Sequence, residues 1–135
     1  MNTIILEADI KVAYVTAKSF PKGITEAFEK LDSIVPSANN RRHFGISQPN
    51  KNNVIIYKAA VEEQHKGEAE KFGLESFVIQ KGQYIYKDIL NYSEKPQNIS
   101  DTFRQLISQP NIDPDGYCLE WYLNESDVRC MVRIV

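Results

Sequence analysis

Tyr117-Cys118-Leu119-Glu120-Trp121-Tyr122-Leu123, followed by Val128 to Val135, predicts the strand pair around which the fold is organised. Bulky apolar side chains occupy the odd positions of the first stretch, and Cys118, Glu120 and Tyr122 occupy the even positions. Because successive side chains of a strand point to opposite faces, this alternation predicts one buried face and one mixed face. The residues between the two stretches, 124–127, are typical of a turn.

A register follows from matching apolar residues across this hairpin. If Leu123 pairs with Val128, the further pairs on the same face are Trp121 with Cys130, Leu119 with Val132, and Tyr117 with Ile134. All four pairs are apolar, which favours this register. We therefore expect Trp121 in the core and Glu120 on the less buried face, opposite Met131. In this register Arg129 and Arg133 lie diagonal to Glu120, where a guanidinium could pair with the carboxylate and neutralise it.

Composition excludes several classes of protein. A chain of 135 residues is typical of one domain, and a net charge of -2 without a basic cluster argues against direct nucleic-acid binding. No stretch approaches the roughly 20 apolar residues of a membrane span, and the first residues show no signal-peptide pattern. The same register places Cys118 and Cys130 on opposite faces, so we expect no disulfide and a cytoplasmic protein.

The rest of the chain predicts an α+β fold. β-forming runs indicate strands at 10–17, 43–47, 54–61, 76–80 and 83–90. Apolar residues at helical spacing indicate one helix at about 22–35 and a second from Ile99 to Ile107. The charged run Gly67–Lys71 lies in a predicted surface connection and is typical of a solvated face.

The two halves of the chain match each other. Residues 24–31 and 99–106 share the pattern Ile-[Thr/Ser]-acid-small-Phe-x-x-Leu at a shift of 75 residues. We expect two strand–helix–strand–strand modules, about 8–63 and 74–135, that join their strands into one antiparallel sheet within a single domain. Both helices are then expected on one face, which leaves a groove on the opposite face near a pseudo-twofold axis.

The chain resembles the GyrI-like small-molecule-binding domain, which is the effector-binding domain of bacterial multidrug-responsive transcription activators. The resemblance spans nearly the whole chain. It is carried by Lys11–Val15, Ile24, Phe28 and Leu31 in the first half, and by Lys81–Tyr84, Ile99, Leu119–Tyr122 and Met131–Ile134 in the second. The family's Glu-x-Tyr motif corresponds to Glu120 and Tyr122. Two positions depart from the family pattern: Ser19–Lys22 lacks a common glycine, and Arg133 replaces a common proline.

The resemblance implies a standalone, non-enzymatic domain that binds drug-like aromatic or cationic molecules, with glutamate as counter-charge. Such a domain sequesters a toxic compound or acts as a ligand-sensing transcriptional co-regulator with a DNA-binding or regulatory protein partner. The candidate ligand-binding residues are Glu120, Tyr122, Tyr14, Tyr57, Tyr84 and Phe44. Each aromatic residue could instead belong to the core, and Glu120 could be a surface glutamate paired with an arginine.

The alternative function is hydrolysis of reactive electrophilic compounds. Some proteins related to the family act on strained rings, and Glu120 would then activate water or protonate the substrate. We favour binding over catalysis, because no second catalytic group accompanies this acid in the sequence. No cofactor is expected, since the sequence has no phosphate loop, and His43 and His65 lack neighbours at metal-ligand spacing.

Overall fold

The computed structural model describes residues 2–36 and 40–135 and has an α+β fold. The strands are β1 (Asn2–Leu6), β2 (Ile10–Thr16), β3 (His43–Pro49), β4 (Ile55–Glu62), β5 (Glu75–Ile79), β6 (Gly82–Ile89), β7 (Cys118–Tyr122) and β8 (Val128–Arg133). The helices are α1 (Ile24–Ile34), α2 (Glu68–Lys71) and α3 (Gln97–Ile107), with a short 3-10 helix η2 (Tyr92–Glu94) before α3. None of these helices is long and apolar enough to cross a membrane, within the part of the chain described.

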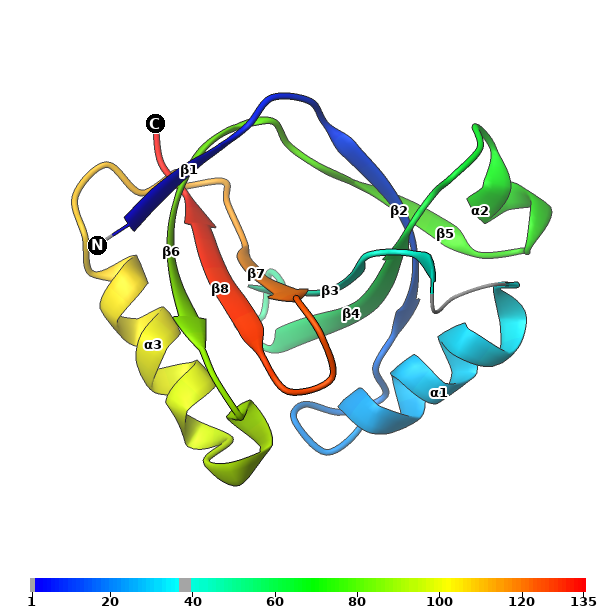
Figure 1. The fold of residues 1–135 in the computed structure, drawn as a ribbon, viewed down its shortest axis with the longest axis horizontal. Helices are drawn as coiled ribbons and strands as arrows, with labels where there is room; N and C mark the ends of the chain where they lie inside the picture. Colours follow the sequence, from blue (N-terminus) through cyan, green and yellow to red (C-terminus); the bar gives the residue numbers. More distant parts are fainter. Residues whose placement is uncertain (1, 37–39) are drawn as a thin grey trace.

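All eight strands form one antiparallel sheet that curls into a half-barrel (Figure 1). The strand order is β1-β6-β8-β7-β3-β4-β2-β5, so β3 and β7 meet at its centre and β1 and β5 form its edges. The single antiparallel sheet was expected from the sequence. The order is symmetric about its centre. From one end it runs β1-β6-β8-β7, and from the other end it runs β5-β2-β4-β3, so β6, β8 and β7 of the second half occupy the places of β2, β4 and β3 of the first. This is consistent with two modules, although a common origin of the halves stays a prediction.

Both long helices cover the same face of the sheet. Leu31 of α1 packs against Val61 of β4, and Phe103 and Leu106 of α3 pack in a cluster with Val128 of β8. The two predicted helices are therefore confirmed, with boundaries within two residues for α1. In Figure 1 they lie along the lower side of the sheet and are separated from each other.

The opposite face of the sheet is filled by the protein's own side chains. Its core cluster consists of Ile10, Val12, Phe44, Ile46, Ala60, Ile79, Tyr84, Tyr117, Leu119 and Met131. Curling brings these side chains together without a covering helix. The expectation of a groove on this face was wrong, because the half-barrel closes on its own apolar residues.

The predicted register of the β7–β8 hairpin was wrong by one residue. Glu120 pairs with Cys130 and Trp121 pairs with Arg129, while Leu123 N–H donates to Asp127 O at 3.0 Å to close the turn. The apolar pattern could not decide the register because both faces of β8 are buried: Cys130 lies under α3 and Met131 faces the half-barrel.

The shift has two consequences for the sequence predictions. Cys118 and Cys130 lie on the same face, as free thiols, rather than on opposite faces. Trp121 is only half-buried, against Phe44, so its expected place in the core was also wrong.

Two elements were missed by the sequence analysis. β1 forms an edge strand beside β6, and α2 lies in the segment expected to be a solvated surface connection. Glu68 and Ala69 of α2 are buried, and Glu68 pairs with Arg41. The sequence analysis predicted that this charged segment is exposed. It could not identify Arg41 as the partner of Glu68, because Arg41 lies 27 positions earlier in the chain.

Candidate functional site

The carboxylate of Glu120 lies at the centre of the sheet, on the face that carries the helices. Its neighbours across the ladder are Gly45 of β3 and Cys130 of β8. Gly45 in turn pairs with Ala59, which packs with α1, whereas Cys130 packs with α3. Glu120 therefore sits between the two helices at the β3–β7 junction of the halves, and only 6% of its surface is exposed.

Two tyrosine hydroxyls bind one oxygen of this carboxylate. Tyr57 and Tyr122 donate to Oε1 at 2.7 and 2.6 Å, and their hydroxyl oxygens are 3.2 Å apart. Oε2 accepts no hydrogen bond from the residues that the structure describes. The carboxylate is thus anchored through one oxygen by two neutral donors.

Gly45 makes room for this arrangement. A Cβ atom at this position would overlap the Tyr57 hydroxyl and lie 2.5 Å from Glu120 Oε1. Any larger residue would push the tyrosine or the carboxylate out of place. The glycine is therefore required by close approach of side chains rather than by its backbone conformation.

The two arginines that could have neutralised Glu120 bind other carboxylates. Arg129 makes two hydrogen bonds to Asp88, at 2.7 and 3.1 Å, and Arg133 binds Asp113 at 3.0 Å. In the observed register both arginines lie on the opposite face from Glu120. Neither arginine therefore neutralises Glu120, which answers the question that the sequence left open, and no described Lys or Arg forms an ion pair with Glu120.

Burial without a cationic partner raises the pKa of Glu120 above its usual value. Loss of hydration is the main cause, because it disfavours the charged form, and the Tyr122 and Tyr57 hydrogen bonds only partly oppose it. The pKa of Tyr57 is also raised, by burial and by the nearby Glu120 charge. Both tyrosines consequently stay protonated and act as donors to the carboxylate.

Further aromatic rings surround the two tyrosines. Phe28 of α1 packs edge-on against Tyr122, with ring centroids 5.5 Å apart, and Tyr92 of η2 does so from the other side at 5.6 Å. Phe20 stacks on Tyr57 at 5.8 Å. The immediate environment of the carboxylate is therefore aromatic rather than ionic.

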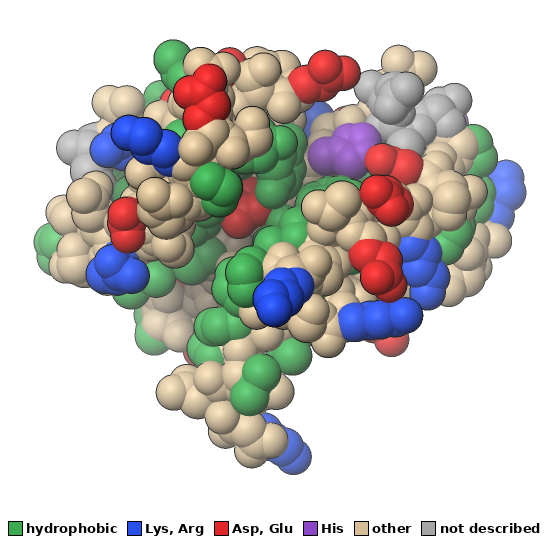
Figure 2. Space-filling view, turned by 90° about the horizontal axis from the view of Figure 1, so that it is seen from below, with side chains coloured by type: hydrophobic (Ala, Val, Ile, Leu, Met, Phe, Trp, Pro, Cys, Tyr) green, Lys and Arg blue, Asp and Glu red, His purple; other side chains and the backbone are tan. Residues whose placement is uncertain are grey.

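A cavity of about 1010 Å³ opens beside this cluster, between α1 and the β7–β8 turn. Its lining includes Ile24, Thr25, Phe28, Glu29, Asp32, Asn40, Arg41, Arg42, His43, Glu62, Tyr92, Trp121, Tyr122, Leu123, Asn124 and Glu125. Figure 2, seen from below Figure 1, shows a hollow with hydrophobic side chains around it and an acidic side chain within. Tyr122 belongs both to the lining and to the carboxylate cluster, so it joins the cavity to Glu120.

The structure brings together three of the six predicted ligand-binding residues. Glu120, Tyr122 and Tyr57 form the hydrogen-bonded cluster. Tyr14, Tyr84 and Phe44 lie on the other face of the sheet: Tyr14 binds Glu75, Tyr84 binds Tyr117, and Phe44 packs in the half-barrel core. Register decides this division, because it sets which face each strand residue joins.

The sequence analysis did not assign Phe28, Tyr92 or Gly45 to the site. Phe28 was read only as a core position of its helix, and Tyr92 lies in a polar connection without a periodic pattern. An isolated glycine within a strand signals a close approach, which makes Gly45 the residue that could have been found from sequence.

No family model matches the sequence, and no curated protein matches it either, so membership of the GyrI-like family stays a prediction. Solved structures with a similar fold do exist. SAV2435, in a structure bound to tetraphenylphosphonium, superposes with a TM-score of 0.67 at 9% identity, covering 99% of this chain and 93% of the other.

Two further structures share the fold at low identity. A hydrolase from Listeria innocua has a TM-score of 0.59 at 8% identity, covering 99% of this chain and 90% of its own. A Staphylococcus aureus protein, whose description proposes a role in bacterial transcription regulation, has a TM-score of 0.58 at 11% identity, covering 98% and 96%. At these identities the comparisons show that the chain shares a fold with these proteins.

Proposed function

We propose that this protein binds a small lipophilic aromatic cation in the cavity between α1 and the β7–β8 turn, with Glu120 as counter-charge. The observation that carries the proposal is a buried carboxylate without a cationic partner, enclosed by aromatic rings. Burying a charge without compensation costs free energy. A ligand that supplies the positive charge removes this cost and is therefore favoured.

The cavity fits such a ligand in size and chemistry. Drug-sized molecules occupy pockets of roughly 300–1,000 Å³ lined mainly by apolar and aromatic side chains. Phe28, Tyr92 and Tyr122 offer ring faces and edges to an aromatic cation, and cation–π attraction adds to the charge attraction of Glu120. The tetraphenylphosphonium bound to SAV2435, which shares this fold, supports the same ligand class here.

A regulatory role fits this binding function. The Staphylococcus aureus protein described as taking part in transcription regulation shares the fold, which supports ligand sensing in the cytoplasm through a DNA-binding or regulatory partner. Simple sequestration of a toxic compound uses the same cavity. A measured change in affinity for a partner protein upon ligand binding distinguishes sensing from sequestration.

Hydrolysis of an electrophilic compound is the second candidate. The raised pKa of Glu120 suits a general acid, and the Listeria innocua hydrolase shares the fold. Binding is favoured because the groups that contact the Glu120 carboxylate, among the described residues, are two tyrosine hydroxyls with raised pKa values. Mass spectrometry of incubated substrate separates the two candidates, since only a hydrolase yields product.

Calorimetric titration with two ions of the same shape and opposite charge tests the proposal. We expect tetraphenylphosphonium to bind and tetraphenylborate not to bind. Glu120→Gln should weaken phosphonium binding by about tenfold or more, because it removes a buried charge partner. Glu125→Gln is the matched control, since this exposed residue lines the same cavity and its charge is screened.

The affinity should also depend on pH. Only the ionised carboxylate attracts a cation, so phosphonium binding should strengthen as the pH rises through the raised pKa of Glu120. Glu120→Gln should abolish this dependence. Equal binding of the phosphonium and the borate, or equal binding by wild type and Glu120→Gln, would falsify the proposed role of Glu120.

A further inference from the structure

Tyr92 is fixed in place at the wall of the cavity opposite α1. Its backbone N–H donates to Ser126 O at 3.0 Å, and the N–H of Asn91 donates to Asp127 Oδ1 at 3.2 Å. These bonds fasten η2 to the β7–β8 turn. The Tyr92 ring then packs edge-on against Tyr122, so Tyr122 is held between Tyr92 and Phe28.

The hydroxyl of Tyr92 differs from the other two tyrosine hydroxyls of the site. Tyr57 and Tyr122 both donate to Glu120 Oε1. Tyr92 lines the cavity half-buried, and no described residue forms a hydrogen bond with its hydroxyl. Burial and the charge of Glu120 raise the pKa of Tyr92, so the hydroxyl keeps its proton and can donate.

Two other polar residues of the lining, His43 and Arg42, already have partners. Both ring nitrogens of His43 have partners, at Arg41 O and Asp32 Oδ1, each 3.0 Å away. Arg42 binds Glu62 through Nε and Nη2. Tyr92 therefore offers the ligand a neutral donor close to the carboxylate, on an element of the second half of the chain.

We infer that Tyr92 determines ligand specificity by donating a hydrogen bond to an acceptor atom of the bound cation. This inference rests on the proposed function and narrows the ligand class to aromatic cations that carry an ether or carbonyl oxygen near the charged centre. A ligand that fills the cavity takes this hydroxyl out of water, so ligands that supply an acceptor are favoured. Glu120 selects the charge, and Tyr92 selects among cations of equal charge.

The test uses pairs of phosphonium ions that differ in one atom. The ortho, meta and para isomers of (methoxyphenyl)triphenylphosphonium are each compared with the (ethylphenyl)triphenylphosphonium isomer of the same shape, by calorimetry on the full chain. We expect at least one methoxy isomer to bind wild type about fivefold more tightly than its ethyl counterpart, the gain of one neutral hydrogen bond. Tyr92→Phe should remove this preference, because it deletes the hydroxyl and keeps the ring.

Tyr86→Phe is the matched control, because Tyr86 lies on β6 under Arg129, outside the cavity lining. This variant should keep the methoxy preference. If no methoxy isomer is preferred by wild type, or if the preference survives in Tyr92→Phe, the inference about Tyr92 is wrong. Failure of every phosphonium to bind wild type contradicts the proposed function instead.

Discussion

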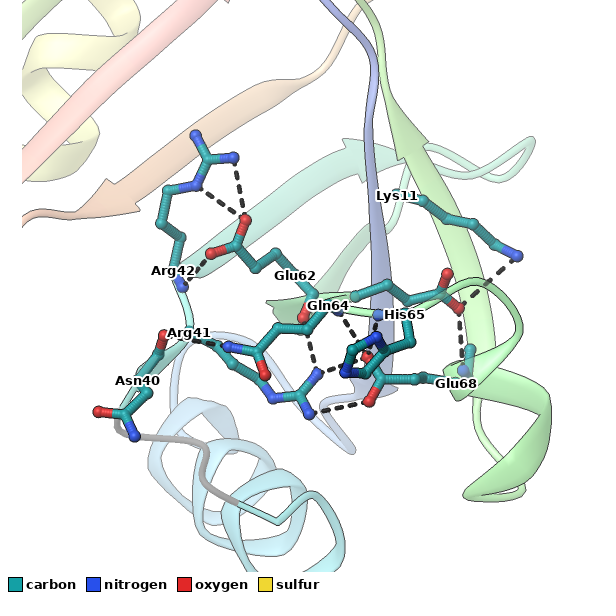
Figure 3. A network of polar contacts seen from close by, with 10 residues as sticks. Lys11, Asn40, Arg41, Arg42, Glu62, Gln64, His65 and Glu68 are labelled. Atoms are coloured by element: carbon teal, nitrogen blue, oxygen red, sulfur yellow. Dashed lines mark hydrogen bonds and ion pairs between the residues drawn. The ribbon is translucent and has the colours of Figure 1, made fainter.

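Glu68 and Glu120 expose nearly the same fraction of their surfaces, 8% and 6%, yet their pKa values shift in opposite directions. Glu68 binds Arg41 through both oxygens, at 2.8 and 2.9 Å, and accepts the backbone N–H groups of Gln64 and His65 (Figure 3). These partners lower the pKa of Glu68 to about 2, with the Arg41 hydrogen bonds as the largest cause.

Among the residues that the structure describes, Glu120 has no such partners. Two neutral hydroxyls bind one of its oxygens, and burial raises its pKa. The comparison shows that the exposed fraction alone does not decide the state of a carboxylate; its depth and the charge of its donors do. The Glu68 carboxylate pairs with Arg41 and holds α2 against the segment before β3, whereas the Glu120 carboxylate forms no ion pair with a described Lys or Arg.

The largest expected effect comes from removing the cation that satisfies Glu68. Arg41→Met leaves this carboxylate buried without its counter-charge, so the free energy of unfolding should fall by about 3–5 kcal/mol. Urea denaturation at pH 7 measures the change. Arg42→Met is the control, because its pair with Glu62 is more exposed and should contribute about 1 kcal/mol or less. Equal losses in the two variants would show that Glu68 does not depend on Arg41.

A second change disturbs the Glu120 cluster through its neighbour. Gly45→Ala places a methyl group against the Tyr57 hydroxyl and Glu120 Oε1, so unfolding should require about 1–3 kcal/mol less free energy. Removing the hydroxyl relieves the overlap, and Gly45→Ala should therefore cost less in a Tyr57→Phe background. A double-mutant cycle measured by denaturation checks this. If the losses of stability from Gly45→Ala and Tyr57→Phe are strictly additive, Gly45 is not needed to make room for the Tyr57 hydroxyl.

The smallest and most discriminating effect is in the pH dependence of stability. The folded pKa of Glu120 lies above its unfolded value of about 4.3, so the native state holds a proton that the unfolded state loses. Its contribution to stability is therefore lost as the pH rises from about 4.3 through the folded pKa. For Glu68 the folded pKa of about 2 lies below the unfolded value, so stability is lost as the pH falls through this window.

Melting temperatures of wild type, Glu120→Gln and Glu68→Gln from pH 3 to 8 measure these slopes. Glu120→Gln should lack the decline of wild type at rising pH, and Glu68→Gln should lack the decline at falling pH. A change of slope in the same direction for both variants would contradict the contrast between the two carboxylates.

Local pattern was enough to predict most of the elements and one part of the site. The apolar spacing of Ile24–Ile34 and Ile99–Ile107 predicted both long helices, since helical periodicity is a property of adjacent residues. β-forming runs and alternation predicted seven of the eight described strands. The resemblance to the GyrI-like domain paired Glu120 and Tyr122 as site residues, and their spacing of two places them on one strand face.

The β7–β8 register and the partners of the two buried glutamates depend on tertiary packing, which no local pattern of the sequence records. The register of β7 and β8 depended on both faces of β8 being buried, and the one-residue shift placed Glu120 among tyrosines instead of arginines. The partners of the two buried glutamates, Arg41 and Tyr57, lie 27 and 63 positions away in the chain. The order of residues along the chain therefore predicted most of the elements and supplied the two acids, whereas long-range packing determined that Glu68 binds an arginine and Glu120 binds two tyrosines.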